Sequence, residues 1–137
     1  MTRSPRTILV VDDEPSLRGL IARMLRLDGH HVLEAAGGAA ALALYAEHGQ
    51  EISVLVTDIV MPDMDGRALA TRLRELSPTL GVVFMSGFVP QNAFDIGDSP
   101  QVRFLSKPFR STDIARAVRG LMMMTPVREA VPVQVEK

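Results

Sequence analysis

Three short apolar runs, each followed at once by a polar residue or a turn signal, constrain the fold of this sequence most. They cover residues 7–11, 52–57 and 81–85 and are rich in branched side chains. Runs of this length and composition are typical of buried strands. Two further segments, residues 31–35 and 102–106, mix apolar with polar residues, which favours strands at the edges of a sheet. The sequence therefore predicts five strands, three of them interior.

Helical patterns separate these strands. Apolar residues recur every three or four positions along residues 15–28, and similar stripes occupy residues 41–48 and 66–77. A weaker and more polar pattern covers residues 90–97. A fifth helix begins at Ser111, which we expect to be its N-cap, and continues to about Met124. The predicted order is thus a strand followed by a helix, five times over.

This alternation predicts an α/β fold with a parallel five-stranded sheet, helices on both faces and right-handed crossovers. With the mixed segments at the edges, the strand order 2-1-3-4-5 fits, which is the flavodoxin-like doubly wound (βα)5 arrangement. We expect one domain over residues 6–124. Residues 125–137 contain two prolines and no helical stripe, so they are expected to form a flexible C-terminal tail.

Charge and composition exclude several classes of function. Fifteen Lys and Arg residues stand against sixteen Asp and Glu residues, and the net charge of −1 offers no basic surface for direct nucleic-acid binding. No cysteine is present, which excludes disulfides and thiolate chemistry. No apolar run approaches the ~18 residues of a membrane span. We expect a cytoplasmic protein that binds neither membrane nor nucleic acid.

Acidic residues follow two of the predicted interior strands. Asp12 and Asp13 come directly after the first strand, and Asp58 comes directly after the third. Ligands of doubly wound sheets bind where the strand order reverses, outside the carboxyl ends of these two strands. Carboxylates meeting there repel one another unless a cation lies among them, and oxygen-only ligands favour Mg²⁺. Helix capping could explain Asp13 but leaves Asp12 and Asp58 unexplained, so the pattern predicts a divalent-metal site.

A hydroxyl and an ammonium group are expected at the same edge of the sheet. Ser86 ends the fourth strand and Lys107 ends the fifth. Each residue alone is most often a turn residue or a solvated charge. Phosphoryl transfer needs an oxygen nucleophile, a metal ion and donors for the charge on the phosphoryl oxygens. Together, these groups predict a site for that chemistry.

Four segments carry a family resemblance. In order and spacing, they closely resemble the receiver domain of two-component response regulators, and the resemblance covers about residues 6–124. The segments are Val10-Val11-Asp12-Asp13-Glu14-Pro15, the ten residues from Thr57 to Gly66, Met85-Ser86-Gly87 and Lys107-Pro108-Phe109.

The resemblance implies a role for each acidic residue. Asp58 would accept a phosphoryl group from a phosphohistidine. Asp13 would bind Mg²⁺ or Mn²⁺ directly, together with Asp58, and Asp12 would bind it largely through water. The backbone carbonyl of Val60 would complete the protein ligands.

The resemblance also implies roles at the fourth and fifth strands. Ser86 and Lys107 would hold the phosphoryl oxygens, and the Lys107–Pro108 bond would be cis. Phe104 would be the switch aromatic that moves inward when Ser86 is drawn toward the phosphate. Ser86 stands where Thr is commoner, and Phe104 stands where Tyr is frequent, so a switch hydrogen bond from this ring is lost.

A module of this kind takes its phosphoryl group from a sensor histidine kinase or a histidine phosphotransfer protein and then changes its affinity for an output partner. The implied partner surface comprises residues 90–97, 102–106 and 111–124, and phosphorylation-dependent homodimerisation is a further expectation. The output itself stays unknown. Self-catalysed phosphoryl transfer and dephosphorylation are the only catalytic steps expected, so the chain is not expected to be an enzyme.

Two alternatives remain open. Residues 85–88 are similar to receivers at the carboxyl ends of hybrid sensor kinases, so the chain could act within a phosphorelay. An aspartyl-phosphate hydrolase is the second alternative. Hydrolases of that type carry a general acid two residues beyond the nucleophile, and Val60 occupies this position here.

Two other patterns invite a functional interpretation. Asp63, Asp65 and Gly66 hint at a calcium loop, but the earlier ligands and the closing Glu are missing, so we expect Asp65 to be an N-cap. The three histidines could suggest a phosphohistidine relay. Their positions at the ends of predicted elements favour structural roles; they are His30, His31 and His48.

Overall fold

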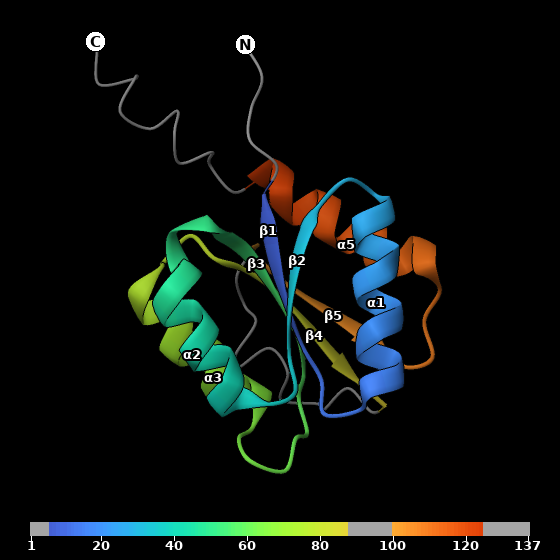
Figure 1. Cartoon of the computed structure of the whole chain (residues 1–137). Coiled ribbons are helices and arrows are strands. Elements are labelled where there is room, and N and C mark those ends of the chain that lie inside the picture. The colour runs from blue at the N-terminus through green and yellow to red at the C-terminus, as the bar shows by residue number, and fades with distance from the viewer. Residues whose placement is uncertain (1–5, 88–99, 125–137) are drawn as a thin grey trace, which may run out of the picture.

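A computed structural model describes residues 6–87 and 100–124 and contains a parallel sheet of five strands. Figure 1 shows the strands running through the middle of the molecule, from the end where β1 begins toward the opposite rim. Their order across the sheet is β2-β1-β3-β4-β5, which confirms the predicted doubly wound topology. The strands are β1 (Thr7–Val11), β2 (His31–Ala35), β3 (Ile52–Asp58), β4 (Gly81–Ser86) and β5 (Val102–Ser106).

Helices cover both faces of the sheet. In Figure 1, α1 and α5 lie against one face, and α2 and α3 lie against the other. The predicted helix over residues 90–97 and the predicted tail over residues 125–137 lie outside the described residues. The described helices are α1 (Pro15–Leu27), α2 (Gly38–His48), α3 (Gly66–Leu76) and α5 (Ser111–Met124), with a short 3-10 turn, η1, at Gly49–Glu51.

The strand side chains explain this layering, because successive residues of a strand point to opposite faces. Ile8 and Val10 of β1 belong to the core beneath α1 and α5, whereas Leu9 and Val11 belong to the core beneath α2 and α3. All five residues of β1 are buried. Such a strand needs helices on both sides, which accounts for its central position.

The ends of the elements differ in part from the predictions. Ser111 is the first residue of α5 rather than its N-cap. The Arg110 carbonyl accepts the first helical bond, from the Ile114 N–H, and the Asp113 carboxylate accepts the Arg110 N–H at 2.9 Å, so the cap falls one residue earlier. Asp65 is the N-cap of α3, as expected, and accepts the Arg67 N–H at 2.7 Å.

Strands β3 and β4 each extend one residue further than predicted, to Asp58 and Ser86. Both residues pair with a neighbouring strand, Asp58 with Met85 and Ser86 with Ser106. The polar residues that seemed to end these strands are therefore held by the sheet itself. Within the described part of the chain, no helix is both long and apolar enough to cross a membrane.

Candidate functional site

The carboxyl ends of β1 and β3 bring three carboxylates together. The last paired positions of these adjacent strands are Val11 and Thr57, so the residues that follow meet at one edge. One oxygen each from Asp12, Asp13 and Asp58 lies within 4.8 Å of the others. Asp12 is fully buried, Asp58 is 9% exposed, and Asp13 is exposed. The cluster is thus built on rigid strand ends and opens to solvent on one side.

Asp12 is the most constrained of the three. Its Oδ1 accepts the Glu14 N–H at 2.9 Å, whereas its buried Oδ2 has no hydrogen-bond partner among the described residues. Burial raises the pKa of Asp12 above 3.8, the Glu14 N–H and the Lys107 ammonium lower it, and Asp58 and Asp13 raise it further. A buried carboxylate oxygen without a hydrogen bond is costly, so this atom is suited to bind a cation.

Lys107 supplies a positive charge on the same rim. Its Nζ lies 3.2 Å from Asp58 Oδ2 and 3.7 Å from Asp12 Oδ2. The main chain holds the residue in place, because the Lys107 N–H donates to the Ser86 carbonyl at 2.7 Å. The Lys107–Pro108 bond is cis, the isomer that the sequence resemblance implies. One ammonium group faces three carboxylates, which leaves the cluster with excess negative charge.

The donor set suits a hard divalent cation. Every candidate ligand is an oxygen, and the orphaned Asp12 Oδ2 shows that the protein alone does not satisfy the cluster. Mg²⁺ and Mn²⁺ prefer such ligands. The carboxylate of Asp63, by contrast, accepts the N–H groups of Gly38 and Ala39 at the start of α2.

The buried Ser86 side chain and the half-buried Phe104 flank the cluster on β4 and β5. Phe104 stacks on Phe84, with ring centroids 5.3 Å apart, and the two residues are partners in the β4–β5 register. Phe104 therefore packs against the core beneath α2 and α3.

Gly66 has a role at the site that its place in the motif did not reveal. Its N–H donates to the Ile59 carbonyl at 2.8 Å and closes the loop between β3 and α3. A Cβ at this position would overlap the carbonyl oxygen of Asp58 and lie 3.0 Å from its carbonyl carbon. The α3 backbone thus packs directly on the main chain of Asp58, and only glycine allows this approach.

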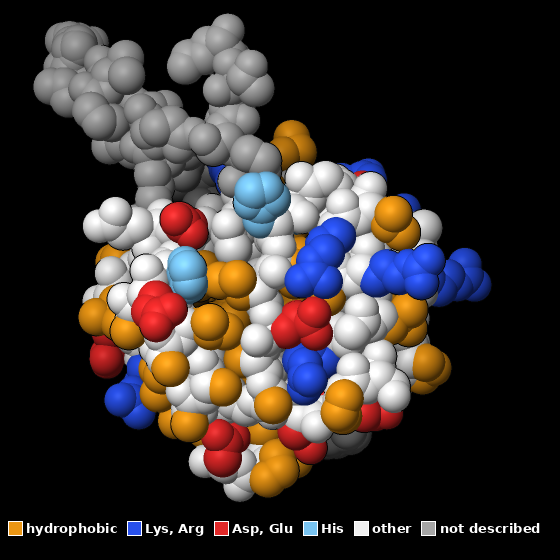
Figure 2. All heavy atoms as spheres, viewed as in Figure 1, with side chains coloured by type: hydrophobic (Ala, Val, Ile, Leu, Met, Phe, Trp, Pro, Cys, Tyr) orange, Lys and Arg blue, Asp and Glu red, His pale blue; other side chains and the backbone are white. Residues whose placement is uncertain are grey.

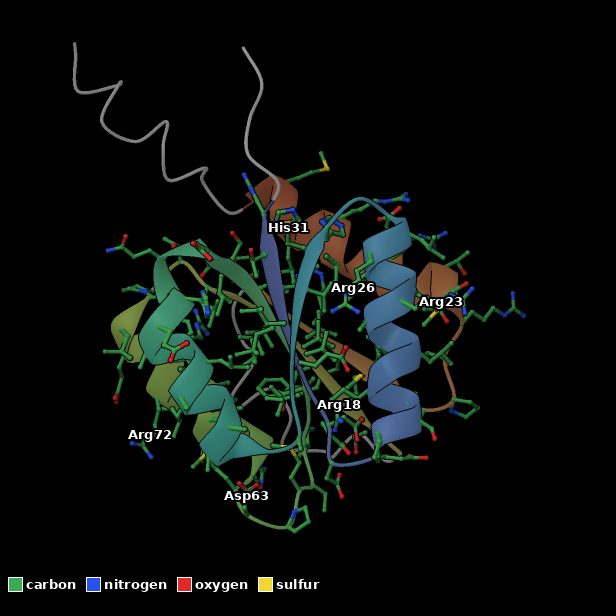
Figure 3. All side chains as sticks on the ribbon, viewed as in Figure 1. Arg18, Arg23, Arg26, His31, Asp63 and Arg72 are labelled. Carbon is green, nitrogen blue, oxygen red and sulfur yellow. The ribbon has the colours of Figure 1, made fainter. Side chains whose placement is uncertain are left out.

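Arg18 is a second residue that the sequence reasoning missed. Its Nη1 donates to the main-chain carbonyl of Asp12 at 2.8 Å, and its Nε lies 3.4 Å from Glu34 Oε1. Arg26 contacts the other oxygen of Glu34, also at 3.4 Å. Figure 2 shows this line of alternating basic and acidic side chains over α1 and β2, and Figure 3 labels both arginines. No motif marks Arg18, because its contact with the site is made to a backbone atom.

Comparisons with known proteins agree with this geometry. The family model of the response regulator receiver domain matches residues 8–119. The chain is 36% identical over 118 residues to the sensor kinase CckA of Brucella abortus (strain 2308), covering 85% of this chain but only 12% of that protein. It is 34% identical over 119 residues to the response regulator receiver protein CpdR of the same organism, covering 86% of this chain and 98% of CpdR.

A solved structure gives the same picture. The crystal structure of a response regulator receiver protein from Sinorhizobium medicae WSM419 superimposes with a TM-score of 0.81 at 31% identity. The match covers 90% of this chain and 98% of the other. The likeness thus extends over most of the chain.

Proposed function

The chain belongs to the response regulator receiver family, and from this premise we propose that it accepts a phosphoryl group on Asp58 and thereby changes its affinity for a partner. Receiver domains are signalling modules rather than classical enzymes, and they interact with histidine kinases, phosphotransfer proteins and output domains. The receiver unit of this proposal is residues 6–124. Its main support is the convergence of three carboxylates and Lys107 on one rim.

Asp58 would be the acceptor, because its carboxylate belongs to the cluster and lies nearer to Lys107 than that of Asp12 does, at 3.2 Å against 3.7 Å. A carboxylate oxygen of Asp58 attacks the phosphorus of a phosphohistidine. A P–O bond forms while the P–N bond breaks, and the imidazole leaves with the electron pair of that bond. Lys107 lies 3.2 Å from Asp58 Oδ2, close enough for its ammonium to bind an oxygen of the incoming phosphoryl group. Ser86 would supply a hydroxyl from the end of β4.

Asp12, Asp13 and Asp58, with the carbonyl of Val60, would hold the Mg²⁺ or Mn²⁺ ion. When bound, the ion neutralises charge that develops on the phosphoryl oxygens. The side chain of Val60 is 75% exposed and carries no acid. This supports a phosphoacceptor rather than a hydrolase, which needs a general acid at that position.

A small phosphodonor tests the proposal without the cognate kinase. We expect acetyl phosphate with Mg²⁺ to add one phosphoryl group to the protein, measured by intact mass spectrometry. Chelation of the metal should prevent the reaction, and Asp58→Asn should prevent it at every metal concentration. Glu75→Gln removes an exposed carboxylate from α3 and serves as the control. Equal uptake with and without chelator would refute the proposal.

Phosphorylation would be sensed on the part of the predicted partner surface that β5 and α5 supply; the predicted helix at residues 90–97 lies outside the described residues. Phe104 lies on β5 beside β4, which ends at Ser86, and Met123 presents an 87% exposed apolar side chain on α5. A switch aromatic and an exposed apolar residue on adjoining elements support a transient contact there. The partner is an output protein or a second phosphorylated copy of this chain.

Amide hydrogen exchange checks this surface. With beryllofluoride and Mg²⁺ as the phosphoryl mimic, we expect altered exchange at Ser86, along β5 and along α5. The reason is that a hydroxyl drawn toward the phosphoryl oxygens shifts the end of β4, which is hydrogen-bonded to β5. Changes restricted to α1 and α2 would contradict this assignment.

The likeness to both CckA and CpdR leaves two settings for the same chemistry. CckA is a sensor kinase of which the chain matches 12%, and CpdR is a receiver protein of which it matches 98%. Both matches are to a receiver unit, so a response regulator and a relay receiver of a hybrid kinase are both compatible with them. In either setting, the acceptor is the carboxylate of Asp58.

A further inference from the structure

The loop between Asp58 and α3 is attached to α2 by one side chain. Asp63 Oδ1 accepts the Gly38 N–H at 3.1 Å, and Asp63 Oδ2 accepts the Ala39 N–H at 3.0 Å. These N–H groups hold the pKa of Asp63 below 3.8. Figure 3 shows Asp63 at the rim of the molecule, below the first turn of α2. An anion at a helix N-terminus is favourable, and this one comes from 24 to 25 residues away in sequence.

The residues at the start of α2 provide no side chain of their own to accept the free N–H groups, and Asp63 accepts them instead. The N-cap of α2 is Gly37, which has no side chain to accept an N–H. A Cβ at Gly37 would lie 2.7 Å from Asp63 Oδ1, and a Cβ at Gly38 would lie 2.6 Å from the Cβ of Met64. Glycine at both positions lets the loop approach the helix. The cap is thus supplied by the loop, and the helix start is shaped to receive it.

This loop has further anchors besides Asp63. The Ile59 N–H donates to the Met85 carbonyl at 3.0 Å, and the Gly66 N–H donates back to the Ile59 carbonyl at 2.8 Å. Met61 is buried in the core beneath α2 and α3. Val60 lies between Ile59 and Met61 and exposes its side chain. Asp63, two residues beyond Met61, holds the same loop against α2 and so helps to fix the main chain around Val60.

We propose that Asp63 is a positioning residue for the metal site: by capping α2, its carboxylate holds the loop so that the Val60 carbonyl stays within reach of a cation held by Asp12, Asp13 and Asp58. The inference rests on the proposed function for its biological meaning. In physical terms, it states that the affinity for the metal depends on Asp63, although Asp63 does not bind the metal. Outer residues that orient metal ligands commonly change metal affinity by about 10-fold or more.

Calorimetric titration with Mg²⁺ tests this dependence. We expect Asp63→Ala to raise the Kd for Mg²⁺ about 10-fold. Asp63→Asn keeps one acceptor oxygen and should have an intermediate effect. Ala43→Gly is the matched control. It lowers the stability of α2 at an exposed position and leaves the loop unchanged. Asp63→Ala and Ala43→Gly should both lower the unfolding midpoint by a few degrees, but only the Asp63 variants should weaken Mg²⁺ binding.

Amide exchange and phosphorylation complete the test. In Asp63→Ala, the Gly38 and Ala39 amides should exchange faster, and saturating Mg²⁺ should restore acetyl phosphate uptake close to the parent rate. An unchanged Kd in folded Asp63→Ala, or an equal change in Ala43→Gly, would overturn the inference. If the parent binds Mg²⁺ but takes up no phosphoryl group, the proposed function fails. The change in Kd for Mg²⁺ in Asp63→Ala still tests whether Asp63 positions the metal site.

Discussion

Lys107→Ala is expected to slow phosphoryl uptake by about 100-fold and, at the same time, to tighten Mg²⁺ binding. The slower uptake follows from the loss of a donor for the phosphoryl oxygens. The tighter binding follows because Nζ lies 3.2 Å from Asp58 Oδ2 and 3.7 Å from Asp12 Oδ2, where its charge opposes that of the metal. Removing it should lower the Kd by about 10-fold.

The opposite signs of these two effects make the prediction specific. The rate is measured with acetyl phosphate at saturating Mg²⁺, and the Kd by calorimetric titration. Lys107→Arg keeps the positive charge, so its Kd for Mg²⁺ should be closer to the parent value than that of Lys107→Ala. Arg72→Ala removes one positive charge from exposed α3 and should change neither quantity. Weaker Mg²⁺ binding in Lys107→Ala would contradict the electrostatic account of the site.

Gly66→Ala is expected to destabilise the fold by about 3 kcal/mol, the upper end of the usual cost of overpacking. The new Cβ would overlap the Asp58 carbonyl oxygen and lie 3.1 Å from the Ile59 Cα, and both neighbours are backbone that cannot rotate away. The strand end that carries Asp58 must then move. Phosphoryl uptake should fall together with the stability.

Urea unfolding measures the free-energy change, and Gly19→Ala supplies the comparison. Gly19 lies in α1, and a Cβ there would meet no atom within 4 Å. Because Ala is a better helix former than Gly, that variant should gain about 0.5–1 kcal/mol. The same substitution thus has opposite signs at two helical glycines. A Gly66→Ala protein within 1 kcal/mol of the parent would show that Asp58 and α3 are not in close contact.

Much of the fold was predictable because its signals are local. The run at residues 7–11 is apolar at every position after Thr7, as expected for a strand covered on both faces, and all five residues are buried in the structure. The mixed composition of residues 31–35 and 102–106 correctly indicated the two edge strands. Once the interior and edge strands were identified, the alternation of strands and helices along the sequence allowed few arrangements of the sheet.

The site was predictable only where strand ends determine it. Asp12, Asp58 and Lys107 follow strands of one parallel sheet, so their meeting follows from topology. Arg18 and Asp63 were missed as supports because they bind main-chain atoms, in the case of Asp63 those of a helix start 24 to 25 residues away, and such contacts leave no side-chain pattern. Ser111 was misplaced because an N-cap depends on where the first helical bond forms, and Arg110 makes that bond.

The position of the transferred phosphoryl group tests the central claim most directly. Phosphoramidate carries the P–N bond of a phosphohistidine and can react with the protein in the presence of Mg²⁺. Borohydride reduction of the resulting acyl phosphate, followed by peptide mass spectrometry, marks the acceptor residue. The account predicts homoserine at position 58 alone, and only when Mg²⁺ is present. A phosphoryl group on His30, His31 or His48, or reduction at another carboxylate, would contradict it.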